Sequence, residues 1–268
     1  MSTIAKPATL QRAGIATAAL VALLIAVRVW GTALRDPAML TGGVLLALVL
    51  LLAAYGAKKA LPFLPLGGST AWMHLHSWAG FLAVAAYGLH AGVRVPTGVL
   101  ETLLALSFVL VAASGIAGLA LARVLPPMLR ARGEPILFSR IPALRRTVAD
   151  RAAALVAPSR ALADHHRLHL AAWLEAPGDA LHHLRGSRVA LQRRLEHTEA
   201  LFRYLTPDEQ TTARELMDLI KQKDLLDVNH ALQTALRAWT LIHVPITGAL
   251  VLLGIAHALT VVAFRGGL

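Results

Sequence analysis

Long apolar blocks alternate with short polar connections along most of the chain. Runs of roughly 18 or more residues with almost no charge lie at 13–32, 39–56, 71–93, 97–122 and 238–264. A helix of about 20 apolar residues crosses the ~30 Å hydrocarbon core of a bilayer, because each residue adds about 1.5 Å. The pattern therefore predicts five membrane-spanning helices.

One long stretch departs from this pattern. Residues 123–237 hold 18 basic and 13 acidic residues, against 8 and 2 in the rest of the chain. Pro126-Pro127 should end the fourth span, and further prolines at 142, 158 and 177 should break this stretch into short helices. Thr206-Pro207, followed by two acids, is typical of a helix start.

These patterns together predict an all-α protein. We expect a bundle of five transmembrane helices with a helical cytoplasmic domain between spans four and five. Residues 1–122 would form spans one to four, residues 123–237 the cytoplasmic domain, and residues 238–268 the fifth span with a short periplasmic tail.

Composition excludes several classes of protein. With 56% hydrophobic and 15% charged residues, and a mean hydropathy of +0.60, the chain is too apolar for a soluble domain. There is no cysteine, which excludes disulfides, thiolate-bound iron–sulfur clusters and covalently attached c-type haem on this chain. The net charge of +11 comes without an RNA-binding or helix-turn-helix pattern, so no nucleic-acid partner is expected.

The distribution of Lys and Arg predicts the orientation. With five spans, the N-terminus, the Lys58-Lys59 loop and the basic domain share one side, which the positive-inside rule makes cytoplasmic. We therefore expect a bacterial inner-membrane protein whose N-terminus and large loop are cytoplasmic and whose C-terminus is periplasmic. Residues 1–12, with Lys6 and Arg12, indicate a retained signal anchor.

Four histidines stand out inside the predicted spans. His76 and His90 lie in the third span and His243 and His257 in the fifth, and both pairs are 14 residues apart. Fourteen residues fall about 40° short of four helical turns and rise about 21 Å. Because one span separates them, the two helices should run parallel. His76 should then face His243 on the cytoplasmic side, and His90 should face His257 on the periplasmic side.

The neighbouring residues repeat as well. Trp72 and Trp239 each precede the first histidine of their span by four residues, and small residues fill the intervals between the histidines. His74 lies about 160° from His76 around the helix, so we leave it out of the pair. Two opposed imidazoles are the axial arrangement that a six-coordinate haem iron requires.

The two segments, WMHLHSWAGFLAVAAYGLH and WTLIHVPITGALVLLGIAH, resemble the core of di-haem cytochrome b in the quinol:cytochrome c oxidoreductases. The size and span count also resemble the cytochrome b subunits of respiratory reductases, such as that of nitrate reductase. The resemblance implies two b-type haems, one ligated by His76 and His243 and the other by His90 and His257. It does not extend to residues 123–237.

A di-haem cytochrome of this kind would carry electrons across the membrane. Lacking cysteine clusters, it would exchange them with a quinone pool or with partner subunits that carry iron–sulfur clusters or c-type haem. An electron-transfer subunit of an oxidoreductase complex is favoured over a stand-alone quinol-dependent reductase. A proton or metal transporter lined by histidines is the third alternative.

Other polar residues leave alternatives open. Arg94 and Arg237 lie near the histidines in sequence, and each could pair with a haem propionate or mark a helix end. Glu101 could accept a proton or bond a neighbour. The histidines at 165, 166, 169, 182 and 183 could form a weak divalent-metal site, but a solvated helix face is favoured.

Overall fold

The computed structural model describes residues 7–32, 37–60, 68–92, 94–130 and 136–265. Within these ranges every regular element is a helix and none is a strand, which confirms the predicted all-α class. The start of the predicted signal anchor, residues 1–6, lies outside them. The chain divides into two compact units: Met1–Leu119 with Thr240–Leu268, here called the apolar unit, and Ala120–Trp239, here called the charged unit.

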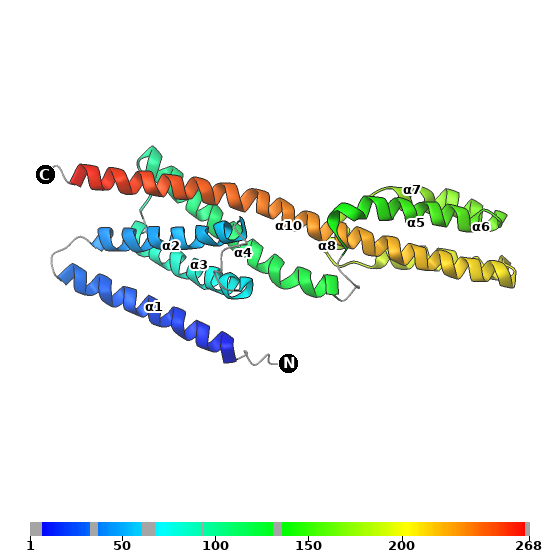
Figure 1. The fold of residues 1–268 in the computed structure, drawn as a ribbon, viewed down its shortest axis with the longest axis horizontal. Helices are drawn as coiled ribbons and strands as arrows, with labels where there is room; N and C mark the ends of the chain where they lie inside the picture. The colour runs from blue at the N-terminus through cyan, green and yellow to red at the C-terminus, as the bar shows by residue number, and fades with distance from the viewer. Residues whose placement is uncertain (1–6, 33–36, 61–67, 93, 131–135, 266–268) are drawn as a thin grey trace. The chain divides into compact units, whose positions relative to one another are not determined.

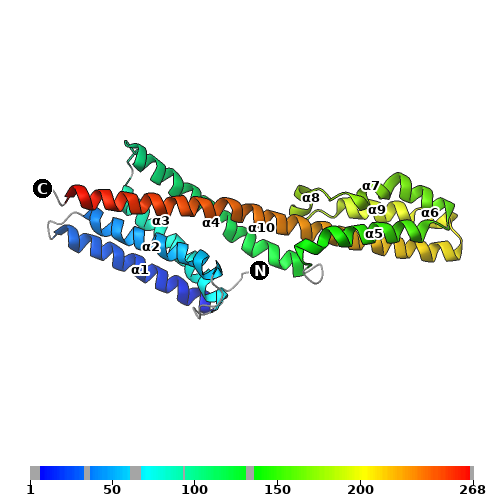
Figure 2. The same cartoon turned by 45° about the horizontal axis from the view of Figure 1, so that its top comes forward.

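The apolar unit is built from five helical segments. Helices α1, α2 and α3 lie side by side, and α3 packs against both of the others (Figures 1 and 2). Helices α4 and α10 are shared with the charged unit, and this unit contains α4 up to Leu119 and α10 from Thr240. The bounds of these helices are α1 Pro7–Thr32, α2 Pro37–Ala60, α3 Ser69–Ala91, α4 Val99–Arg130 and α10 Pro207–Arg265.

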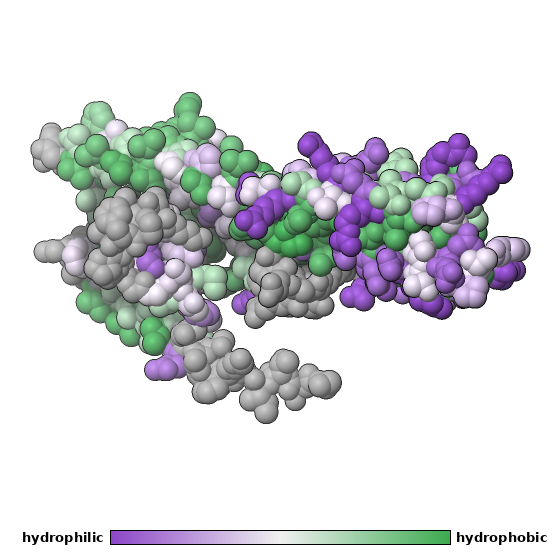
Figure 3. All heavy atoms as spheres, turned by 45° about the vertical axis from the view of Figure 1, so that its right-hand side comes forward, coloured by the Kyte–Doolittle hydropathy of each residue, from purple (hydrophilic) through white to green (hydrophobic). Residues whose placement is uncertain are grey.

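Four of the described helices are long and apolar enough to cross a membrane: α1, α2, α4 and α10. Helix α3 is less apolar because its 23 residues include three histidines and two tryptophans, so the fifth span stays a prediction. Large apolar side chains point outward, among them Phe81, 52% exposed, and Leu252, 71% exposed. Figure 3 shows apolar residues over this unit and many polar ones over the charged unit. Such a surface is compatible with lipid contact.

Two predicted helix boundaries are wrong. Helix α4 continues through Pro126-Pro127 to Arg130, because two prolines close to a helix end remove only two backbone hydrogen bonds. The fifth span was expected to start as a separate helix at residue 238, yet α10 is continuous from Pro207 to Arg265. No glycine or proline lies between residues 208 and 244 to interrupt it.

The predicted start of α10 is confirmed. The backbone N–H of Glu209 donates to Thr206 Oγ1 at 3.4 Å, and the backbone N–H of Thr206 donates to Glu209 Oε2 at 3.0 Å. This reciprocal pair is a capping box. Ser159, which caps the N-terminus of α6 (Arg160–His165), also donates to the Glu209 carboxylate at 2.6 Å. The hydrogen bonds from Ser159 and Thr206 lower the pKa of Glu209.

The rest of the charged unit consists of short helices that share a core with α10. Several end where prolines predict: α5 (Ile141–Val156) stops before Pro158, and α7 (Ala171–Glu175) stops before Pro177. The π-helical turn η2 (His166–Leu170) joins α6 to α7, and α8 (Ala180–Leu184) and α9 (Val189–Glu199) follow. The common core includes Ile141, Val148, Ala152, Leu162, Leu170, Leu174, Leu216 and Ile220.

An ion pair is buried beside this core. Lys223 is 0% and Asp227 2% exposed, and the Lys223 ammonium donates to the Asp227 carboxylate. The same ammonium lies 4.5 Å from the centroid of the Trp173 ring, and Arg145 approaches Asp227 within 3.6 Å. Burial lowers the pKa of Lys223, and the hydrogen bond to Asp227 opposes that shift. Removing either partner would leave an uncompensated buried charge.

The core of the charged unit should respond strongly to a cavity. Leu216 is 0% exposed, so Leu216→Ala should lower the free energy of unfolding by about 2–5 kcal/mol. Leu181 is 55% exposed, and Leu181→Ala should change it by less than about 0.5 kcal/mol. Urea titrations in mild detergent, followed by far-UV circular dichroism, measure both. Equal effects of the two substitutions would contradict the described core.

Candidate functional site

The histidines of α3 and α10 form two pairs of the same geometry. The ring centroids of His76 and His243 are 6.4 Å apart with planes at 71°, and those of His90 and His257 are 6.4 Å apart with planes at 76°. The two pairs are related by a step of 14 residues along both helices. Because the step has the same sign on both, α3 and α10 run parallel through this region.

A packed cluster lies midway between the two pairs. Ala83 is seven residues from both histidines of α3, and Leu250 is seven residues from both histidines of α10. These two pack in one cluster with Val49 of α2 and Phe108 of α4, and the ring of Tyr87 stacks on Phe108 at 4.2 Å. Four helices therefore meet between the two histidine levels and hold them apart.

The hydrogen bond of His76 determines which ring nitrogen carries its proton. Its Nδ1 lies 3.2 Å from the carbonyl oxygen of Leu52. A carbonyl oxygen can only accept, so Nδ1 must carry the proton and donate it. In the neutral ring the lone pair is then on Nε2.

Two hydroxyl groups determine the same tautomer for two more histidines. Ser114 donates its single proton to the Val111 carbonyl at 2.9 Å, so its oxygen accepts from His243 Nδ1 at 2.7 Å. Thr41 likewise donates to a backbone carbonyl of its own helix and accepts from His90 Nδ1 at 3.2 Å. An imidazole that donates from one nitrogen in this way is the form in which histidine usually ligates a metal through the other.

A glycine follows each of these hydroxyl residues and lies against the same histidine. A Cβ atom at Gly42 would come within 2.7 Å of His90 Cε1, and one at Gly115 would lie 3.9 Å from His243 Cε1. The sequence analysis missed both Thr41-Gly42 and Ser114-Gly115. The available signal was a hydroxyl residue followed by glycine in each apolar block that flanks the third span.

The spacing of the rings fits two imidazoles on opposite sides of one metal ion. A bond of about 2 Å from metal to imidazole nitrogen places the two ring centroids about 6 Å apart, close to the 6.4 Å of both pairs. Two imidazoles alone are a poor site for a bare ion. In the described part of the chain no group of three or more His, Asp or Glu could hold one. The ion would have to bring its remaining ligands, as the iron of a porphyrin does.

The two arginines of the predicted site lie in different surroundings. Arg94 is exposed beyond the end of α3. The guanidinium of Arg237 lies 3.9 Å from the centroid of the Phe138 ring in the charged unit. Near the His76 end of α3, Lys58 Nζ is 6.0 Å from the centroid of the Trp72 ring. A propionate contact of either arginine stays a prediction.

Glu101 has a structural partner. Its carboxylate accepts a hydrogen bond of 3.3 Å from the backbone N–H of Thr97 and so satisfies a donor at the start of α4. This contact favours the second of the two expected roles, a hydrogen bond to a neighbour.

The solvated histidine face expected in the charged unit is wrong for two of its five members. His165 is 8% and His183 6% exposed. His165 Nε2 lies 3.2 Å from Thr198 Oγ1, and its ring centroid lies 5.3 Å from that of His169. The reason is the π-helical turn that starts at His166, which changes the helical phase and hence the residues that face the core.

Comparisons of the chain with protein-family models, curated proteins and solved structures find no match. The functional argument therefore rests on the geometry of the histidine pairs.

Burial of His165 should make the charged unit less stable in acid. Burial, with the charges of nearby histidines, lowers the pKa of His165 from 6.5 to about 4. Between these values the unfolded chain binds more protons than the folded one, so stability falls as the pH decreases through this window. His165→Gln keeps a donor for Thr198 and removes the titration, and its urea midpoint should change less between pH 7 and about pH 4.5. An unchanged pH dependence would contradict this assignment.

Proposed function

We propose that this protein is a di-haem b-type cytochrome that carries electrons across a bacterial inner membrane. The observation that carries the proposal is the geometry of two histidine pairs with the same 6.4 Å spacing on two parallel helices. His76 and His243 would hold one haem, and His90 and His257 the other. A bound haem supplies a one-electron redox change at iron.

The chain itself would orient the ligands and exclude water. Hydrogen bonds from Nδ1 to Leu52, Ser114 and Thr41 hold three of the rings in the ligating tautomer. The cluster around Ala83 and Leu250 keeps apolar side chains between the two levels. The levels are separated by about 21 Å of helix rise, which favours one site toward each membrane surface.

The packing supports the finer topology of five spans. Helix α3 runs beside and parallel to α10 between the two histidine levels, so it crosses the same layer as the apolar part of α10. Its 23 residues span about 35 Å, enough for the hydrocarbon core. With α1, α2, α4 and α10 this gives five spans. The positive-inside rule then places the N-terminus and the charged unit in the cytoplasm and the C-terminus in the periplasm.

The electron donor and acceptor would lie outside the chain. Because it contains no cysteine, we propose exchange with quinone or with redox partner subunits, in an electron-transfer subunit of a larger complex. A stand-alone quinol-dependent reductase would use the same two sites. Quinol added to the isolated protein separates these possibilities, since only the reductase should be reduced without partner subunits.

Removal of a single ligand should remove one haem. His76→Ala and His243→Ala should each reduce the haem content from two per chain to one, because both act on the same pair. His90→Ala and His257→Ala should remove the other haem. A pyridine haemochrome assay measures the stoichiometry, and a reduced-minus-oxidised spectrum identifies the b type.

The matched control is His74→Ala, on the same helix two residues from His76. This variant should keep both haems. A colourless wild-type protein purified with haem supplied would contradict the proposal and favour a transporter. Retention of two haems after loss of His76 or His243 would refute the pairing.

The hydroxyl contacts should tune one haem each. Loss of the acceptor for Nδ1–H makes the imidazole a weaker donor to iron, so Ser114→Ala should raise the potential of the His76–His243 haem. A net hydrogen-bond energy of about 1 kcal/mol corresponds to a shift on the order of 50 mV for one electron. Thr41→Ala should shift the other haem instead. Redox titration measures both potentials.

Thr102→Ala provides the control for this experiment. Its hydroxyl bonds only within the first turn of α4, so both potentials should stay at their wild-type values. A shift of both haems in Ser114→Ala would indicate a general structural change and contradict a local effect.

A further inference from the structure

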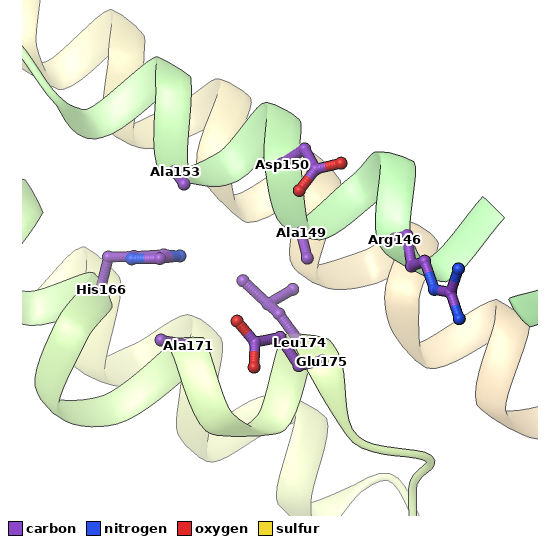
Figure 4. Close-up of a pocket in the computed structure, with 8 residues that line it drawn as sticks. All are labelled: Arg146, Ala149, Asp150, Ala153, His166, Ala171, Leu174 and Glu175. Carbon is purple, nitrogen blue, oxygen red and sulfur yellow. The ribbon is translucent and has the colours of Figure 1, made fainter. Parts of the chain in front are cut away.

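A cavity of about 390 Å³ opens in the charged unit between α5 and the segment formed by η2 and α7 (Figure 4). Ala149, Ala153 and Ala171 line it, and their small side chains leave the space open. Pockets that bind small molecules begin at about 300 Å³. The cavity lies wholly within one unit and shares no residue with the histidine pairs of α3 and α10.

One polar atom at this cavity has no partner. His166 Nε2 is buried and makes no hydrogen bond, and Figure 4 shows the His166 ring pointing into the space. A buried polar atom without a partner costs free energy, so it marks a place that water or a ligand would fill. Burial lowers the pKa of His166, and the nearby Glu175 opposes this shift. At neutral pH the ring is therefore uncharged.

The backbone at this position is also irregular. The π-helical turn η2 begins at His166 and ends at Leu170. Such turns interrupt the regular hydrogen bonding of a helix and occur frequently at functional sites. Here the turn places His166 on the cavity wall just before α7, which supplies Glu175.

The charged groups define what the cavity would accept. Asp150 comes from α5 and Glu175 from α7, so a carboxylate lines each wall. Carboxylates only accept hydrogen bonds, and a neutral imidazole can accept one more. Arg146 also lines the cavity, but in Figure 4 its guanidinium lies away from the His166 ring. A ligand at the His166 end should therefore be a cation with several N–H donors.

We propose that this cavity binds a small protonated amine, whose ammonium group donates hydrogen bonds to Glu175, Asp150 and the His166 ring. A metal ion fits less well, since no described cluster of three ligating side chains has the geometry to hold one. This site is independent of haem binding, so either proposal can fail without the other.

The test is calorimetric titration of the full-length protein in detergent at low salt with putrescine. Saturable binding with one site per chain is expected. The matched ligand 1,4-butanediol has the same length and no charge, so it should give no saturable heat. Absence of putrescine saturation, or equal binding of the diol, would overturn the proposal.

Substitutions locate the site. Glu175→Gln and Asp150→Asn keep the size of the side chain and remove its charge, so each should weaken putrescine binding about tenfold. Glu199→Gln removes an exposed acid on α9 and should bind as the wild type does. Equal weakening in all three variants would show attraction by overall charge and overturn the site. Saturable Zn²⁺ binding that is lost in the two cavity variants, without a putrescine signal, would overturn the amine assignment.

Discussion

The parallel packing of α3 against α10 is the constraint on which the apolar unit depends. Side by side in opposite directions, these helices could bring only one of the two equally spaced histidine pairs into register. Parallel packing gives both pairs the same ring separation of 6.4 Å. Helices α2 and α4 then complete the arrangement, because each contributes a side chain to the central cluster and a hydroxyl group to one histidine.

Much of this arrangement was predictable because it depends on regular periods. Apolar block length predicts the helices, and a step of 14 residues places two imidazoles on one helix face whatever the neighbours are. The start of α10 at Thr206-Pro207 was predictable for a similar reason, since a capping box is local in sequence. These features require no knowledge of how distant segments pack.

The features that were missed depend on packing between segments distant in sequence. Thr41 and Ser114 contact histidines 49 and 129 residues away, and no local pattern specifies the rotation of their helices. The π-helical turn at His166 changes which histidines of the charged unit are buried. The continuation of α4 through Pro126-Pro127 shows that a strong breaker loses its effect near a helix end.

The apolar cluster around Ala83 and Leu250 has a further consequence for the proposed electron carrier. No charged side chain belongs to this cluster, so little screens the charge at one redox centre from the other. Over about 21 Å, with an effective dielectric constant of about 20, two unit charges interact by about 0.8 kcal/mol. The first electron would therefore make the second harder to add. Two centres of equal intrinsic affinity would titrate as two separate waves.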